Sequence, residues 1–394
     1  MPLFKKCDDF TTAKELIAKG IYPYFHELQS RQDVEVMMEG KRRIMLGSNN
    51  YLGLTVHPEV VEAGIKALEK YGTGCSGSRF LNGTLDMHLQ LEHEIAEFLG
   101  KEAAVTFPTG FQTNLGIIST IAGRHEYILC DRENHASIYD GCRLSYAETL
   151  RYRHSDMADL ERQLERLPYD AGKLIITDGI FSMGGDICKL PEIVALAEKY
   201  QARVMVDDAH SFGVIGNGGR GTADYFGLTD KVDIIMGTFS KSLASLGGFM
   251  ATSERVAHYV RHTSRPFIFA ASIPPANCAT ALAALNVIRN HPEIVTRLSD
   301  LARYMRNALK ERHVPIIEST TPIIPIYTYQ PEPTLVTTMR LFEEGVYVNS
   351  VLPPACAPNE CLMRTSLMAS HTEALIDEAA EIIQRVMDEQ GLLK

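Results

Sequence analysis

The middle of the chain alternates short apolar runs with segments of helical periodicity. Apolar runs at 103–107, 127–130, 174–177, 204–206 and 234–236 predict buried strands, and a pattern such as that at 190–200 predicts a helix between them. Short apolar runs separated by helices are typical of a mostly parallel sheet with helices on both faces. We therefore predict an α/β protein.

The flanking segments have different patterns and divide the chain into three parts. Residues 1–45 read as an aromatic, irregular N-terminal arm, and residues 46–285 as the large domain. Residues 286–394 read as a smaller C-terminal α+β domain, which closes with a helix that begins near Thr372 and ends at Gly391.

Two local patterns predict structure near the start of the chain. Glu39 and Gly40 mark a hairpin turn between short strands. Pro58 is suited to the first turn of a helix, and that helix carries Val61, Ile65 and Leu68 on one face.

Composition narrows the class of protein. With 394 residues, 45% hydrophobic and 22% charged, the chain is predicted to be a globular protein of enzyme size. Its net charge of -10 argues against a nucleic-acid partner. No segment predicts a secretory signal or a membrane-spanning helix. The eight cysteines are scattered without metal-binding spacing, so we expect reduced thiols in a cytoplasmic protein and no metal site.

The predicted strands share a feature at their ends. Each is followed by small or polar residues, in the stretches "PTGFQTN", "DRENHAS", "DGIFSMGG", "DDAHSFG" and "GTFSKS". In open α/β sheets ligands bind at the carboxyl ends of the strands. We therefore expect these stretches to converge on one pocket.

Lys241 and Asp207 indicate the chemistry of that pocket. A lone lysine is usually a solvated surface charge, but Lys241 follows a buried strand and lies among small residues. Partial desolvation frees the neutral amine for Schiff-base chemistry. Asp207 alternatively caps the next helix, but a carboxylate at this strand end suits pyridoxal 5'-phosphate (PLP), whose ring nitrogen must stay protonated.

Other strand-end residues fit the same cofactor. Thr109 and Gly110 begin a helix, where backbone N–H groups favour a phosphate, and Thr238 and Ser240 add hydroxyl donors. A lone histidine is most often structural, but His135 would lie over a pyridine ring here and also carry protons.

With these residues in place, the sequence resembles the α-oxoamine synthases, which are fold-type-I PLP enzymes that condense an amino acid with an acyl-CoA and release CO2. The resemblance runs from about Ile21 to Val386. It is carried by "SNNYLGL", "YGTGCSGSRFLNGTLDMHLQLE", "TGFQTN", "DRENHASIYDG", "DGIFSMGGDI", "VDDAHSFGVIGNGGRG", "GTFSKSLASLGG" and "LMRTSLMASHT", in this order. It implies a fold-type-I transferase with a mostly parallel central sheet and a small C-terminal domain.

The resemblance also implies roles for individual residues. Lys241 would carry the cofactor as a Schiff base and later move protons, while Asp207 would pair with the ring nitrogen and His135 would stack on the ring. The remaining cofactor contacts would come from His210, Ser182, Gly110, Phe111, Thr238 and Ser240.

The amino-acid substrate and a second subunit are implied in the same way. Arg364 would bind the substrate carboxylate, with Asn49 and Tyr51 completing that site. Family members are typically homodimers with the active site at the subunit interface. The chain departs from the family pattern in two loops: Gly184 replaces an acidic residue, and Ala270 and Ala271 replace hydroxyl residues, for which Ser272 would substitute.

The identity of the substrates is a separate question. The runs "GIYPYFHELQS", "SRFLNGTLDMHLQLE", "KLPE" and "SLMASHT" look most like bacterial members that join L-serine to palmitoyl-CoA and give 3-ketodihydrosphingosine. Alternatives are glycine C-acetyltransferase, 8-amino-7-oxononanoate synthase, an autoinducer synthase, a carrier-protein-dependent synthase or a non-catalytic partner subunit. A sphingoid product would make transient membrane contact reasonable.

Overall fold

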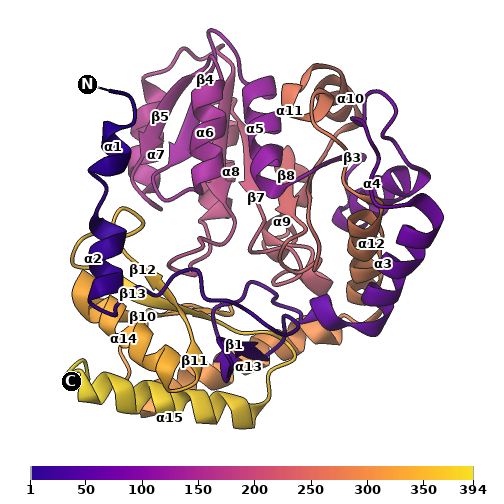
Figure 1. The fold of residues 1–394 in the computed structure, drawn as a ribbon. Helices are drawn as coiled ribbons and strands as arrows, with labels where there is room; N and C mark the ends of the chain where they lie inside the picture. Colours follow the sequence, from indigo (N-terminus) through magenta and orange to yellow (C-terminus); the bar gives the residue numbers. More distant parts are fainter. Residues whose placement is uncertain (1, 394) are drawn as a thin grey trace. The chain divides into compact units, whose positions relative to one another are not determined.

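The computed structural model describes residues 2–393, and the chain divides into two compact units (Figure 1). One unit comprises Asn49–Ser299, and the other combines Met1–Ser48 with Asp300–Lys394. The boundaries predicted from the sequence, at residues 45 and 285, stay a prediction. Within residues 2–393 no helix has both the length and the apolar character needed to cross a membrane.

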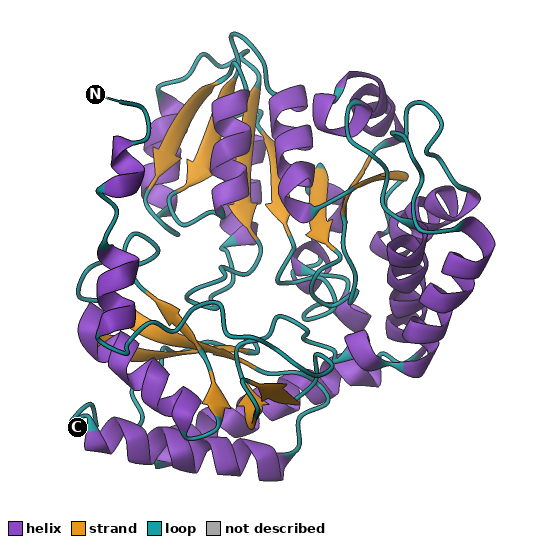
Figure 2. Cartoon of the chain, in the orientation of Figure 1, coloured by secondary structure: helices purple, strands orange, loops and turns teal. Residues whose placement is uncertain are grey.

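A seven-stranded sheet forms the centre of the larger unit (Figure 2). Only β9 runs antiparallel to its neighbours, so the sheet is mostly parallel, as predicted. In spatial order the strands are β3 (Ala103–Phe107), β9 (Gly248–Thr252), β8 (Ile234–Thr238), β7 (Arg203–Asp207), β6 (Lys173–Asp178), β4 (Tyr127–Asp131) and β5 (Glu148–Tyr152).

Helices cover this sheet and bury its apolar side chains. One core joins the sheet to α5 (Gly110–Ile121), α6 (Ala136–Leu144), α10 (Glu254–Thr263) and α11 (Arg265–Ile268). The remaining helices that begin in this unit are α3 (Pro58–Tyr71), α4 (Asp86–Leu99), α7 (Met157–Glu165), α8 (Leu190–Lys199), α9 (Thr222–Tyr225), α12 (Pro275–Asn290) and α13 (Glu293–Glu311), with short 3-10 turns at Leu54–Val56, Asn217–Gly219 and Thr229–Lys231. The boundary between the units falls within α13.

Helix α3 begins at Pro58, as predicted, but its large apolar side chains face outward. Val61, Ile65 and Leu68 are 39%, 52% and 44% exposed. The buried side of the helix carries Val60, Gly64 and Ala67, and it packs against α12. A Cβ on Gly64 would lie 3.0 Å from Thr280 Cγ2, so small residues are what allow the two helices to approach.

The smaller unit contains two three-stranded sheets. In one, β1 (Glu35–Met38) and β2 (Lys41–Met45) form the predicted hairpin, in which Glu39 and Gly40 both have positive φ, and β11 (Val346–Tyr347) pairs with β2. In the other, β13 (Cys361–Ser366) lies between β10 (Ile323–Tyr329) and β12 (Asn349–Val351). The other helices are α1 (Lys5–Asp8), α2 (Thr12–Ala18), α14 (Pro331–Glu343) and α15 (Glu373–Glu389).

The C-terminal helix α15 has the caps expected from the sequence. The Thr372 side chain accepts a hydrogen bond from the Leu375 N–H at 3.2 Å, and Gly391 has a positive φ just beyond the end. Its inward face, which includes Ile376, Ile383 and Val386, is fully buried.

Candidate active site

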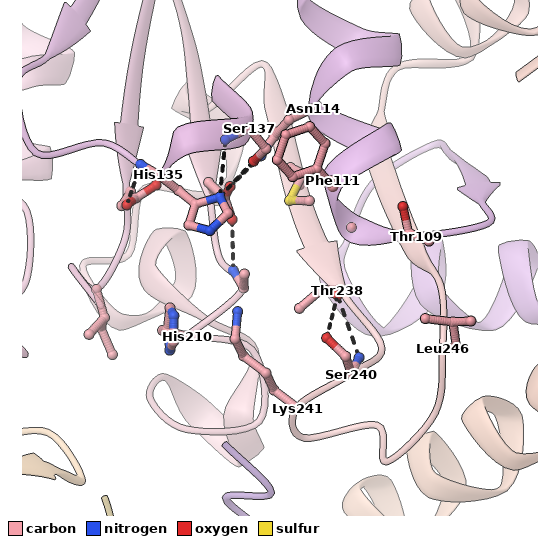
Figure 3. Close-up of a pocket in the computed structure, with 16 residues that line it drawn as sticks. Thr109, Phe111, Asn114, His135, Ser137, His210, Thr238, Ser240, Lys241 and Leu246 are labelled. Atoms are coloured by element: carbon pink, nitrogen blue, oxygen red, sulfur yellow. Dashed lines mark hydrogen bonds between the residues drawn. The ribbon is translucent and has the colours of Figure 1, made fainter. Parts of the chain in front are cut away.

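A cavity of about 250 Å³ lies at the carboxyl ends of the parallel strands (Figure 3). Each of the five strand-end stretches identified in the sequence contributes to it, so the predicted convergence is confirmed. The lining residues are Thr109, Gly110, Phe111, Asn114, His135, Ser137, Asp178, Ile180, Asp207, Ala209, His210, Met236, Thr238, Ser240, Lys241 and Leu246.

Most of the predicted site residues line this cavity. They are Lys241, Asp207, His135, His210, Gly110, Phe111, Thr238 and Ser240. Lys241 is half-buried, and Figure 3 shows its side chain extending from the loop after β8 into the cavity. The residues that do not line it are Ser182, Ser272, Asn49, Tyr51 and Arg364.

One end of the cavity is built to receive an anion. The Thr109 side chain caps α5 by accepting the Gln112 N–H at 3.1 Å, while the N–H groups of Gly110 and Phe111 belong to the first turn and have no acceptor within the helix. Across from them, the hydroxyls of Thr238 and Ser240 lie 3.0 Å apart.

Gly110 is needed for this close approach. A Cβ at this position would lie 2.6 Å from Thr238 Oγ1, which is closer than real Cβ atoms come to any neighbour. The loop after β8 and the start of α5 therefore form a tight cradle whose exposed donors are backbone N–H groups and hydroxyls.

Asp207 ends β7 and is held in one orientation. Its side chain is nearly buried, at 4% exposed for the residue. Oδ1 accepts the Ala209 N–H at 3.0 Å, and Oδ2 accepts the Asn114 side-chain amide at 2.7 Å. The carboxylate is thus fixed at the cavity wall by two N–H donors.

A second carboxyl group, Asp178, lies beside Asp207. The two residues are direct partners in the register of β6 and β7. Burial raises the pKa of Asp178 well above its usual range, and the Asp207 charge adds to the rise. Burial thus favours the protonated form of Asp178, and its Oδ2 accepts the backbone N–H of His135 at 3.1 Å.

The ring of His135 is open to the cavity, and its Nδ1 lies 2.7 Å from Ser137 Oγ. The surrounding protein lowers the pKa of His135 by desolvation, while Asp207 raises it and Lys241 lowers it further. His135 is therefore neutral at pH 7. Phe111 lies edge-on to the imidazole, with ring centroids 6.5 Å apart.

Among the residues that do not line the cavity, Tyr51 still reaches the site indirectly. Its hydroxyl lies 2.6 Å from His210 Nδ1, in a fully buried position. Ser272 instead donates its hydroxyl to the Gly77 carbonyl at 3.1 Å. Asn49 and Ser182 are half-buried, and Arg364 lies on β13 of the other unit, where it is 5% exposed. The roles predicted for these residues stay predictions.

The lining residues fit PLP. The group carries a phosphate, a ring nitrogen that needs an acid partner and an aldehyde that needs an amine. The cavity offers the anion cradle at α5, the fixed carboxylate of Asp207 and the amine of Lys241.

Sequence reasoning missed three polar residues at this site: Asn114, Ser137 and Asp178. Asn114 lies one helical turn after Gly110 and therefore on the same side of α5, a spacing that was available as a signal. Asp178 ends a buried strand, as Asp207 does. Ser137 had no signal, because its importance lies only in its hydrogen bonds to Asn114 and His135.

Comparison with known proteins identifies the class. Residues 41–383 match the family model for aminotransferase class I and II, and the chain belongs to that family. Within it, the chain is 50% identical over 391 residues to a serine palmitoyltransferase of Bacteroides thetaiotaomicron, with 99% of each sequence covered. It is also 41% identical over 382 residues to an 8-amino-7-oxononanoate synthase of Thermoanaerobacter pseudethanolicus, with 96% of each covered.

The solved structures agree with the sequence relatives. A serine palmitoyltransferase structure with a PLP internal aldimine matches with a TM-score of 0.97 and 38% identity, over 100% of both chains. The fold is therefore that of a fold-type-I PLP transferase, and the resemblance to α-oxoamine synthases is confirmed.

Proposed function

We propose that this protein is a PLP-dependent acyltransferase that condenses L-serine with palmitoyl-CoA, giving 3-ketodihydrosphingosine, CoA and CO2. The observation that carries the proposal is the end-to-end similarity to serine palmitoyltransferase, at 50% identity, combined with a cavity that holds a lysine, a fixed aspartate and an anion cradle.

The residues of the cavity divide the work of holding the cofactor and moving protons. The first-turn N–H groups of Gly110 and Phe111, with the hydroxyls of Thr238 and Ser240, bind the phosphate. The Asp207 carboxylate keeps a proton on the ring nitrogen. PLP, when bound, supplies an electron sink for the negative charge that develops on the amino-acid α-carbon.

Lys241 is the proton carrier in this proposal. Its amine reaches the cavity from a loop that follows a buried strand, and it takes the α-proton of the amino acid. His135 covers one side of the site as a neutral ring. Arg364 is the proposed partner of the substrate carboxylate, because a guanidinium binds a carboxylate through two parallel hydrogen bonds.

A direct assay tests the proposal. The purified protein, which should be yellow, is incubated with serine, glycine or alanine and a ladder of acyl-CoAs, and products are identified by mass spectrometry. We expect 3-ketodihydrosphingosine from serine and palmitoyl-CoA. Lys241→Ala should lower the rate by at least about 100-fold, whereas Lys231→Ala, which removes an exposed ion pair with Glu198, should not.

The outcomes separate the mechanism from the substrates. Preference for glycine or alanine with a short acyl-CoA would refute the sphingolipid assignment and favour another α-oxoamine synthase. Full activity of Lys241→Ala would refute the proposed chemistry itself.

We also infer a cytoplasmic homodimer with the active site at the subunit interface. Phe111 and Leu246, which line the cavity, are 43% and 47% exposed, and such apolar side chains at a rim favour a covering subunit. The free thiols, most of them buried, favour a reducing compartment. Transient membrane contact is proposed from the acyl substrate and from Leu3 and Phe4, which are each 72% exposed.

A further inference from the structure

A chain of hydrogen bonds joins Asp207 to His135 through two side chains with no assigned role (Figure 3). The Asn114 amide nitrogen lies 2.7 Å from Asp207 Oδ2 and 2.9 Å from Ser137 Oγ. Ser137 Oγ in turn lies 2.7 Å from His135 Nδ1. Asn114 and Ser137 are each 1% exposed, so solvent water has little access to their hydrogen-bonding groups.

The chemistry of Asn114 gives this chain a direction. The amide nitrogen carries two hydrogens and accepts none, so it donates one to Asp207 and one to Ser137 Oγ. The opposite orientation of the amide would set its carbonyl oxygen against the Asp207 carboxylate, two acceptors with no hydrogen between them. The carbonyl oxygen therefore points away from Asp207.

The direction carries through to the imidazole. The backbone N–H of Ser137 donates to His135 Nδ1 at 3.3 Å, so Nδ1 is the acceptor nitrogen of the ring. Ser137 Oγ already accepts from Asn114, and its own hydrogen is free to point at Nδ1 as well. With two donors aimed at Nδ1, the proton of the neutral ring is placed on Nε2.

We propose that Asn114 is a positioning residue that serves two groups at once: it orients the Asp207 carboxylate, and through Ser137 it holds His135 as the neutral tautomer with its proton on Nε2. This inference rests on the proposed function, because it concerns the residues that would hold PLP and cover its ring.

The arrangement assigns the proton transfers. The one lone pair of the neutral ring, on Nδ1, is engaged by the two Ser137 donors and is therefore a weaker base, while Nε2 carries a hydrogen and has no lone pair to offer. His135 therefore acts as a flat, neutral neighbour of the cofactor and not as the base, which leaves Lys241 to move the α-proton. The titratable groups around His135 are Asp178, Asp207 and Lys241, and Asp178 already holds the His135 backbone N–H.

Two substitutions test the two parts of this hydrogen-bond chain separately: the contact of Asn114 with Asp207, and the link through Ser137 to His135. Asn114→Asp keeps the shape but removes both donors and opposes a second carboxyl to Asp207. Ser137→Ala keeps the Asn114 contact with Asp207 and removes the hydroxyl that links Asn114 to His135, so that only the backbone N–H of residue 137 still donates to Nδ1. Ser137→Thr retains the hydroxyl and should therefore behave as the parent protein does. Ser119→Ala is the matched control on α5, because its hydroxyl donates only to the Leu115 carbonyl within the helix.

The readouts are PLP affinity, from titration of the apoprotein, and the side-chain 15N shifts of His135 in histidine-labelled holoenzyme. For Asn114→Asp we expect a PLP dissociation constant raised roughly 10- to 100-fold, because a hydrogen bond to a charged group is lost. For Ser137→Ala we expect affinity within about threefold of the parent and His135 titrating at higher pH, by about half to one pH unit. Neither readout should change in Ser137→Thr or Ser119→Ala.

Several results would overturn the inference. A His135 proton found on Nδ1 in the parent enzyme would do so, as would a Ser137→Ala variant that loses PLP as severely as Asn114→Asp. If Asn114→Asp does not fold, the Ser137→Ala and Ser137→Thr pair still decides the His135 branch. Neither readout uses serine or an acyl-CoA. The inference therefore holds even if the protein uses other substrates, and failure of the inference would not contradict turnover of serine.

Discussion

The contacts of His154 predict that its contribution to the stability of the folded protein depends on pH. Its Nδ1 lies 3.0 Å from Asp131 Oδ1 and its Nε2 lies 3.1 Å from Asp186 Oδ2. Burial lowers the pKa of His154, but the hydrogen bonds and charges of the two aspartates outweigh burial and raise the pKa to about 10. His154 thus ties the end of β4 to the loop that carries Ser182.

The sign of the pH dependence follows from the raised pKa. The folded state binds the proton more tightly than the unfolded state, whose pKa is 6.5. The stabilisation is therefore complete below pH 6.5 and is lost as the pH rises through the folded value of about 10. The full shift corresponds to about 5 kcal/mol, of which about 2 kcal/mol is lost between pH 6 and pH 8. The Asp186 side chain is 40% exposed, so solvent screens its interaction with His154. We therefore expect the stabilisation lost between pH 6 and pH 8 to be about 1 to 2 kcal/mol.

The measurement compares thermal unfolding of the parent protein with that of His154→Gln from pH 6 to pH 8. The difference in Tm should be largest at pH 6 and should shrink by about 1 to 3 °C at pH 8, given the unfolding entropy of a chain of 394 residues. His291→Gln is the matched control, since His291 also lies 3.1 Å from a carboxylate, that of Glu293, but in an exposed pair. A Tm difference that stays constant with pH, or one equal to that of the control, would refute the reasoning.

Two further predictions concern packing in the larger unit, one at the cavity and one at a buried ion pair. Gly110→Ala should raise the PLP dissociation constant about 10- to 100-fold, because the added Cβ would lie 2.6 Å from Thr238 Oγ1; Gly123→Ala, whose Cβ meets nothing closer than 3.6 Å, should not. Arg79→Met should destabilise the fold by about 3 to 5 kcal/mol, because it leaves the Glu92 carboxylate, 2.8 Å from the guanidinium and 5% exposed, buried without its partner. Arg79→Met combined with Glu92→Leu should recover most of the loss in thermal unfolding, and failure to recover would contradict this account.

Most strands of the central sheet were predictable because buried parallel strands consist of short apolar runs. The position of the cavity was predictable because ligands bind at the carboxyl ends of such strands. The strands β5 and β9 were missed for physical reasons. The sequence of β5, "ETLRY", carries polar residues because the strand lies at the edge of the sheet, and β9, "GFMAT", is short and mixed because it runs antiparallel between two neighbours. The exposure of the apolar face of α3 could not be predicted either, because the spacing of apolar residues identifies a face of a helix but not what packs against it.

The site residues divide in the same way. Lys241 and Asp207 were predicted because each follows a buried strand, so that chain order alone brings them to one edge of the sheet. Ser272 illustrates the limit: its place in the sequence says nothing of the Gly77 carbonyl that takes its hydroxyl. Asn114 and Ser137 act through hydrogen bonds between segments remote in sequence. Helical spacing from Gly110 places Asn114 on the cavity side of α5, but no pattern within its own segment predicts Ser137.

Helix α5 links the two ends of the cofactor cavity. Its first turn supplies the N–H groups of Gly110 and Phe111, and one turn later Asn114 holds Asp207 from the same face. Because a helix moves as a rigid element, a displacement at its N-terminus also displaces the amide that orients the carboxylate. The Gly110→Ala change is therefore expected to disturb His135 as well as the phosphate cradle, since the Asn114 amide also leads through Ser137 to that ring.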